Sequence, residues 1–238
     1  MSSISLQNVT KKFGDFTALS NLDLEIENGQ FVALLGPSGC GKTTTMNMIA
    51  GLEETTQGNI LFDGKDLSHI RIQDRNIGFV FQNYAIFTHL SGYKNLSYGL
   101  EVKKVGKSEI DQRVQAMSKR MGIDHRLDDK ASKLSVNEMQ KVAIARSAIV
   151  EPQIFLLDEP LSNLDASFRA YMRAELKVLQ NEFGQTMIYV THDQIEAMSL
   201  ADKIAIIDNG KLMQYGDPLG IYNNPDNRFV ANFVGSPR

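Results

Sequence analysis

The stretch that decides the fold is Gly36-Pro37-Ser38-Gly39-Cys40-Gly41-Lys42-Thr43. It follows the continuously apolar run Phe31–Leu35 and opens a helix-like stretch, Lys42–Ala50. Its spacing matches the P-loop pattern G-x-x-x-x-G-K-[ST], in which glycines let the backbone curl so that its N–H groups point inward. Those N–H groups and the positive end of the following helix hold phosphate oxygens. A strand, a glycine-rich loop and a helix in this order predict a phosphate-binding α/β unit.

Alternation of apolar residues extends this prediction outward from the loop. Two segments near the N-terminus alternate at period two, as half-buried antiparallel strands do, and Asn209-Gly210 predicts a hairpin turn near the C-terminus. After Pro152, strand candidates alternate with helix candidates, which favours a parallel sheet covered by helices. The N-terminal strands are Ile4–Val9 and Leu22–Ile26; the later strands are 154–157, 186–190, 203–207 and 211–215, with helices at 168–183 and 194–201.

The middle third of the chain differs in composition. From about residue 95 to 150 it is rich in Lys, Glu, Asp, Met and Ala, and Ile110, Val114 and Met117 recur at helical spacing. We therefore predict a helical subdomain at about 88–150, inserted into a P-loop core made of 1–87 and 151–238. The predicted fold class is α/β: a P-loop core sheet, an N-terminal antiparallel β-subdomain and this helical insertion.

Composition excludes several classes of protein. With 42% hydrophobic and 22% charged residues over 238 positions, the chain is neither disordered nor collagen-like. Its longest apolar runs have four or five residues, whereas a membrane-spanning helix needs about 20. The net charge of −3 gives no basic footprint, so no nucleic-acid partner is expected. The single cysteine, Cys40, allows no internal disulfide.

Two acidic residues follow the buried run Ile154–Leu157. The strand would deliver Asp158 to the carboxyl edge of the sheet, where such sheets bind ligands. There Asp158 would hold Mg²⁺ and Glu159 could polarise an attacking water as a general base. An acid pair after a strand is more often a solvated strand end, but the P-loop in the same chain reverses that preference.

Two further polar residues also follow strand candidates. His192, after Met187–Val190, could contact a γ-phosphate and orient a water, and Gln82, after Ile77–Phe81, could reach Mg²⁺ or water. Each signal is weak alone, since a lone histidine is more often structural and a lone glutamine is common on surfaces.

These pieces in this order resemble the ATP-binding subunits of ABC transporters, over essentially the whole chain. In that family the Walker A motif matches Gly36–Thr44, the Walker B motif Ile154–Glu159, the D-loop Ser162–Asp165, the Q-loop glutamine Gln82, the switch histidine His192 and the adenine-stacking aromatic Phe13. The resemblance implies ATP and Mg²⁺ as cofactors. It implies catalysis by Glu159, His192 and Lys42, nucleotide contacts from Phe13, Ser38, Gly39, Cys40, Gly41, Lys42, Thr43, Thr44, Gln82 and Asp158, and metal ligation by Thr43, Gln82 and Asp158.

Three segments narrow the resemblance to the ATPases of bacterial carbohydrate importers of the maltose-importer type. They are Val80–Ala85, Tyr189–Met198 and Asn224–Pro237. In those relatives the last segment leads into a C-terminal regulatory β-domain, whereas here the sequence ends at Arg238. We expect that this domain is either absent or truncated, and favour truncation.

One motif departs from the family pattern. The family's signature is Leu-Ser-Gly-Gly-Gln, and the aligned residues here are Leu134-Ser135-Val136-Asn137-Glu138. In the family, two subunits pair head to tail and each signature faces the partner's nucleotide. Val136 adds a branched side chain where glycine had none, and Glu138 places a negative charge near a phosphate, which is unfavourable unless a cation intervenes. Ser135 could still donate a hydrogen bond, and Asn137 tolerates unusual backbone angles. A heterodimer with a second ATPase is the interpretation we favour; a homodimer with a tolerated variant signature is the alternative.

The resemblance also implies partners and a location. The segment Gln82–Tyr93 would dock a cytoplasmic helix of an integral-membrane permease, at the cytoplasmic face of the inner membrane, and an extracytoplasmic solute-binding protein would act indirectly. The imported solute would be a sugar, a polyol or a related carbohydrate. Alternatives are an ATP-binding gating subunit with little hydrolysis, or a non-transport ABC ATPase. The latter usually has coiled-coil insertions or two fused halves, which this chain lacks.

Overall fold

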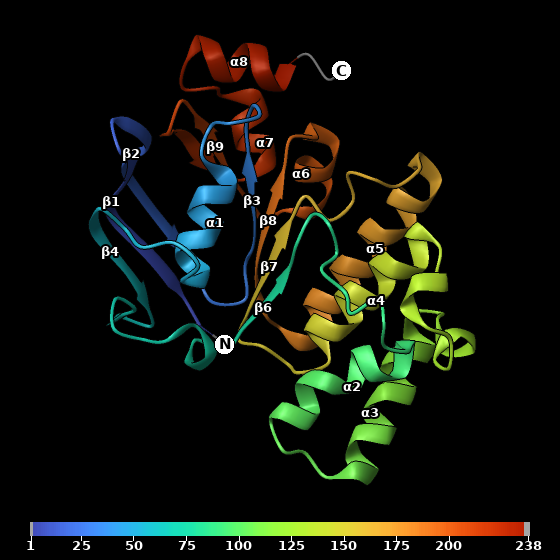
Figure 1. Ribbon diagram of the computed structural model, residues 1–238. Coiled ribbons are helices and arrows are strands. Elements are labelled where there is room, and N and C mark those ends of the chain that lie inside the picture. The colour runs from blue at the N-terminus through green and yellow to red at the C-terminus, as the bar shows by residue number, and fades with distance from the viewer. Residues whose placement is uncertain (1, 236–238) are drawn as a thin grey trace.

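The structure, a computed structural model, describes residues 2–235. Helix α1 (Lys42–Ala50) lies between two β-sheets, and further helices cover the opposite face of the larger sheet (Figure 1). This arrangement confirms the predicted α/β class. The end of the importer-like segment, Ser236-Pro237, lies outside the described residues.

The larger sheet carries the P-loop. Its strand order is β10-β9-β3-β8-β7-β6, with parallel pairing throughout except between β9 and β10, which form the hairpin predicted at Asn209-Gly210. Both turn residues have positive φ, 46° and 74°, as this tight turn requires. The strands are β3 (Phe31–Leu35), β6 (Ile77–Val80), β7 (Ile154–Asp158), β8 (Thr186–Thr191), β9 (Lys203–Asp208) and β10 (Lys211–Gly216).

Both faces of this sheet are buried, which explains the continuous apolar runs. In β3, Val32 and Leu34 face α1 and the smaller sheet, while Phe31, Ala33 and Leu35 face the helices on the other side. All five are fully buried. The sheet therefore separates two hydrophobic clusters and holds the loops at its carboxyl edge on a rigid base.

The smaller sheet is antiparallel, with the order β2-β1-β4-β5. Its first two strands are longer than the predicted Ile4–Val9 and Leu22–Ile26, because they continue into a hairpin that pairs Phe13 with Phe16. Register shifts in this pair break the period-two pattern, so the alternation does not reveal the extended part. The strands are β1 (Ile4–Phe13), β2 (Phe16–Ile26), β4 (Gln57–Phe62) and β5 (Lys65–Asp66).

Helices fill the middle of the chain and cover the larger sheet. Three of them, α2, α3 and α4, lie between β6 and β7, inside the range predicted to be helical; the division into subdomains stays a prediction. Within residues 2–235, no helix combines the length and apolar character needed to cross a bilayer. The helices after α1 are α2 (Gly92–Val102), α3 (Lys107–Arg120), α4 (Val136–Ala148), α5 (Ala166–Phe183), α6 (Gln194–Leu200), α7 (Pro218–Asn223) and α8 (Arg228–Gly235).

Candidate functional site

The P-loop joins β3 to α1 and is shaped by two glycines. A Cβ at Gly36 would lie 2.1 Å from the carbonyl oxygen of Ile207 in β9, so only glycine fits this approach. Gly41 caps α1 with φ +109°, and a Cβ there would meet Leu19 Cδ2 at 2.7 Å and Ala18 O at 2.9 Å. Strand β9 therefore contacts the loop at Gly36 and strand β2 contacts it at Gly41. The curled form of the loop requires glycine at both positions.

Lys42 and Cys40 face the inside of the loop. The Lys42 ammonium donates hydrogen bonds to the carbonyls of Gly36, at 2.8 Å, and Pro37, at 2.7 Å, and lies 3.6 Å from Cys40 Sγ. Burial raises the pKa of the Cys40 thiol, and the charge of Lys42 offsets this only in part. The lysine is thus held by its own loop, and the cysteine is a buried neutral thiol.

Thr43 and Asp158 meet at the carboxyl edge of the sheet. The Thr43 hydroxyl, in the first turn of α1, donates to Asp158 Oδ1 at 3.1 Å, as two ligands of one metal ion would be placed. Burial raises the pKa of Asp158, while the hydrogen bond from Thr43 opposes that rise. The carboxylate is 8% exposed, so it lies in a low-dielectric position where a cation is strongly favoured.

Glu159 is held between two residues predicted to act with it. Its Oε1 lies 3.1 Å from His192 Nδ1, and its Oε2 accepts a hydrogen bond from Gln82 Nε2 at 3.3 Å. The backbone of Glu159 has φ +42°, and its N–H donates to Val190 O of β8 at 3.0 Å. This left-handed residue turns the chain directly after β7, and the backbone hydrogen bond to β8 fixes where the Glu159 side chain starts.

Gln82 and Asp158 line the same cavity. It has a volume of about 400 Å³, and its walls include Gln82, Asn83, Asp158 and Asn163. Asn163 of the D-loop also donates to Gln82 O at 3.5 Å. The structure therefore gathers the predicted residues of Walker A, Walker B, the Q-loop and the switch at one edge of the sheet.

Phe13 lies at the edge of this region. It is 46% exposed at the end of β1, and Lys11 places its ammonium 4.7 Å from the centre of the ring. The same hairpin strand, β2, supplies Leu19 and Ala18 to the P-loop contact at Gly41. An exposed aromatic ring on the hairpin that contacts the loop can stack on a planar base.

The signature segment begins helix α4. Ser135 is the N-cap and forms a capping box: its hydroxyl accepts the Glu138 N–H at 3.4 Å, and its own N–H donates to Glu138 Oε2 at 2.8 Å. The Ser135 hydroxyl also lies 2.8 Å from Glu138 Oε2, to which it donates. Glu138 thus occupies the groups that Ser135 would offer to an external anion.

The negative charge of Glu138 is compensated within the chain. Its Oε1 lies 2.9 Å from Arg126 Nε and 3.9 Å from His125 Nε2. Burial acts to raise the pKa of Glu138, but the hydrogen bonds from Ser135 and the charge of Arg126 outweigh it and leave the pKa below its usual value. Val136 is 44% exposed beside this cap. Arg126, from the segment between α3 and α4, therefore neutralises part of the Glu138 charge within the chain.

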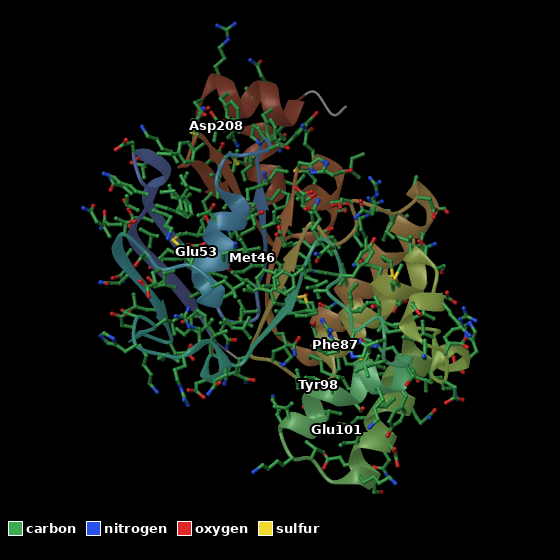
Figure 2. The ribbon with its side chains drawn as sticks, in the orientation of Figure 1. Met46, Glu53, Phe87, Tyr98, Glu101 and Asp208 are labelled. Carbon is green, nitrogen blue, oxygen red and sulfur yellow. The ribbon has the colours of Figure 1, made fainter. Side chains whose placement is uncertain are left out.

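An aromatic pair marks the surface where the Q-loop meets α2. The rings of Phe87 and Tyr98 are 4.9 Å apart, and Figure 2 shows the two residues close together, with Glu101 further along α2. Arg146 of α4 lies 5.1 Å from the Phe87 ring and donates to Ala85 O at 2.9 Å. Tyr98 of α2 is 47% exposed and Phe87 is half-buried, so the exposed aromatic surface here comes mainly from α2, next to the Gln82–Tyr93 segment.

Sequence reasoning missed the partners of these residues. The capping box was visible as Ser135-x-x-Glu138, a known helix-start pattern. Arg126 carries no such signal, because only the fold brings it to Glu138. The same holds for Arg169 and Glu196, which lie behind the Glu159–His192 pair.

Comparisons with known proteins show which sequences this chain resembles. The sequence profile described as "ABC transporter" matches residues 19–162. The chain is 48% identical over its whole length to the maltose/maltodextrin import ATP-binding protein MalK of Vibrio vulnificus, and 49% identical to that of Yersinia pestis. It spans 64% of the length of each of these relatives.

Solved structures of similar fold point to the same family. CbiO1 of Clostridium perfringens, part of an ABC transporter complex, superposes with a TM-score of 0.85 at 30% identity, covering 93% of this chain and 90% of that one. A dimeric ATP-binding cassette bound to ADP and Pi superposes with a TM-score of 0.81 at 31% identity, covering 90% of this chain and 98% of the other. On its matched profile, its full-length similarity and its fold, the chain belongs to the ABC transporter family.

Proposed function

We propose that this chain is the ATP-binding and ATP-hydrolysing subunit of an ABC importer. The observation that carries the proposal is the position of the Glu159 carboxylate, between His192 Nδ1 at 3.1 Å and Gln82 Nε2 at 3.3 Å. The Thr43–Asp158 pair lies at the same edge of the sheet. A base, its polar partners and a metal-ligand pair next to a P-loop suit hydrolysis of a phosphoanhydride.

The P-loop would hold the phosphates of ATP. Backbone amides of 38–44 and the N-terminus of α1 attract the negative oxygens, while Phe13 stacks on the adenine. Lys42 would leave the carbonyls of Gly36 and Pro37 and donate to the β- and γ-phosphates. Its present hydrogen bonds keep the ammonium inside the loop, so little reorganisation is needed for that exchange.

The metal position fits Mg²⁺. Residues 2–235 contain no cluster of three or more His, Cys, Asp or Glu side chains suited to a metal. Mg²⁺ bound with a nucleotide needs only one or two protein oxygens besides phosphate and water, and Thr43, Asp158 and Gln82 offer a hydroxyl, a carboxylate and an amide. Bound there, Mg²⁺ supplies charge neutralisation on the phosphates.

Glu159 would act on the attacking water. Its carboxylate is fixed by the backbone hydrogen bond to Val190 and by two side-chain contacts, so it is oriented before the substrate arrives. His192 is 55% exposed and lies on the outer side of Glu159, where it would contact the γ-phosphate. We assign Glu159 as the general base and His192 as its partner on the phosphate.

We further propose a carbohydrate importer. The MalK relatives are named for import of maltose and maltodextrin, and the solute here would be a sugar, a polyol or a related carbohydrate. A permease helix would dock on Gln82–Tyr93, where Phe87 and Tyr98 form an aromatic surface. An extracytoplasmic solute-binding protein would act indirectly, and the chain would lie at the cytoplasmic face of the inner membrane.

The signature segment supports pairing with a second ATPase subunit. Because Glu138 already accepts from the N–H and hydroxyl of Ser135, this α4 offers a weak site to the partner's nucleotide. A partner with glycines in its signature would complete a strong site over this chain's P-loop. The same capping box favours one alternative function, an ATP-binding gating subunit with little hydrolysis of its own.

Steady-state ATP hydrolysis by the purified chain tests these proposals, at concentrations that populate a dimer, with Glu159→Gln as control. We expect ATP binding in both proteins and slow hydrolysis by the wild type alone. The Glu138→Gln variant should hydrolyse ATP faster than the wild type, because a neutral amide removes the negative charge near the partner's phosphate. If neither the wild type nor Glu138→Gln hydrolyses ATP faster than Glu159→Gln, the result would support the gating alternative. Fast, cooperative hydrolysis by the unaltered homodimer would contradict the heterodimer.

A further inference from the structure

We infer that Arg169 is a positioning residue that ties the D-loop (162–165) to the switch loop (191–193) and thereby keeps His192 within reach of Glu159. The inference rests on the proposed ATP hydrolysis, because it assigns a role in that reaction to a side chain outside the recognised motifs.

Arg169 bonds both loops from one guanidinium. It lies in the first turn of α5, directly after the D-loop, and its Nη2 donates to the carbonyl of Leu164 at 3.0 Å. Its Nη1 donates to Asp193 Oδ2 at 3.4 Å. Leu164 belongs to the D-loop and Asp193 follows His192, so one planar group with fixed donors sets the spacing of the two loops.

The residues on either side of His192 are also fixed. The Thr191 hydroxyl donates to Glu196 Oε2 at 2.7 Å and accepts the N–H of Asp193 at 2.9 Å. Asp193 caps α6 by accepting the N–H of Ile195 at 2.8 Å. His192 is therefore the one residue of this loop whose side chain projects outward, at 55% exposure, while its neighbours are bonded inward.

Glu196 forms the buried end of this network. It is 3% exposed and accepts hydrogen bonds from Tyr189 Oη at 2.9 Å and from Thr191. Arg169 Nε lies 3.9 Å from Glu196 Oε1 and is buried without a hydrogen-bond partner. The guanidinium thus compensates a buried carboxylate while two of its nitrogens hold the loops.

Arg169 acts through these loops and not on the reacting atoms. A cavity of about 60 Å³ is lined by Glu159, His192 and Arg169, and within residues 2–235 no hydrogen bond joins Arg169 to either of the other two. Its loss would leave the P-loop intact and would free the two loops to move independently.

The test compares Arg169→Gln with Lys177→Gln. Lys177 lies two turns further along α5 and forms an ion pair with Asp202 at 2.8 Å. Its side chain is 34% exposed and that of Arg169 is 29% exposed, so the two variants remove similar cations. Hydrogen–deuterium exchange is measured over 159–165, 191–196 and the P-loop, and kcat and KM for ATP are measured in the dimer.

Arg169→Gln should speed exchange in both loops by roughly tenfold, leave the P-loop unchanged, and lower kcat about tenfold with KM for ATP within about twofold. Arg169→Lys keeps the charge beside Glu196 and should therefore restore thermal stability. It should not restore kcat, because one ammonium cannot bond Leu164 and Asp193 with the fixed spacing of a guanidinium. Lys177→Gln should change none of these.

Two results would overturn the inference: faster exchange in one loop or in neither, or a kcat fully restored by Arg169→Lys. The exchange measurement needs no catalytic activity. A wild type that does not hydrolyse ATP would refute the proposed function while leaving the link between the loops to be decided by exchange alone.

Discussion

At the scale of single residues, Glu138 illustrates how a charge is accommodated. Its hydrogen bonds with Ser135 and its pairing with Arg126 lower its pKa, so the folded state favours the ionised form. A depressed carboxyl pKa contributes stability above the unfolded pKa, 4.5, and that contribution is lost as the pH falls through the folded value.

Glu138→Gln should therefore lower the free energy of unfolding by roughly 0.5–1 kcal/mol at neutral pH, because the amide keeps the cap but loses the charge. Urea titrations of both proteins between neutral pH and about pH 4 measure the difference, which should narrow toward the acid end. Combining it with Arg126→Gln should cost less than the sum of the two single losses, as expected of a coupled pair. A difference that stays constant with pH would refute this assignment of the charge.

Cys40 is the second residue whose environment sets its chemistry. The thiol is 4% exposed and burial raises its pKa, so little thiolate is present at neutral pH. Alkylation by iodoacetamide should be at least about tenfold slower in the folded protein than in urea. Mass spectrometry of timed samples measures both rates, and equal rates would show that the P-loop opens readily.

At the scale of elements, the P-loop depends on two kinds of glycine. A Cβ at Gly36 would lie 2.1 Å from Ile207 O, whereas at Gly39, with φ +79°, it would meet nothing within 4 Å. Gly36→Ala should cost about 3 kcal/mol or more, because backbone must move. Gly39→Ala should cost roughly 1–2 kcal/mol, the penalty of the left-handed conformation alone. Urea unfolding measures the loss of unfolding free energy in each variant, and an equal loss in the two would contradict the contact between the loop and β9.

Elements were predictable where their signal is local. The apolar run 31–35 with its glycines identified the strand, loop and helix that carry Lys42, and Asn209-Gly210 identified the β9–β10 hairpin. The far ends of β1 and β2 were not predictable, because register shifts break the alternation. Arg126 and Arg169 were not predictable either, because their roles depend on distances between segments that the sequence does not contain.

At the scale of the whole molecule, one hydrophobic cluster runs from the helices of the middle segment into the face of the large sheet. It includes Leu96 of α2, Val114 of α3, Phe155 of β7 and Leu176 of α5. A continuous core favours cooperative unfolding even in a chain of 238 residues.

We therefore expect the helical segment to unfold together with the sheet. Far-UV circular dichroism and tyrosine fluorescence should give coincident urea transitions, and Mg²⁺·ATP at about 100 times its Kd should shift both by about 2.7 kcal/mol. An early transition confined to the helical signal would show that the middle segment unfolds alone.

The contacts around the P-loop also have a consequence for synthesis. Strand β3 pairs with β8 and β9. In the β9–β10 turn, the Gly210 carbonyl accepts the N–H of Ser20, and the Gly210 N–H donates to the carbonyl of Cys40. A loop encoded near the start of the chain is thus braced by residues near position 210. In a growing polypeptide on the ribosome these contacts cannot form until that hairpin has emerged, so the ability to bind nucleotide reports that translation has passed residue 210.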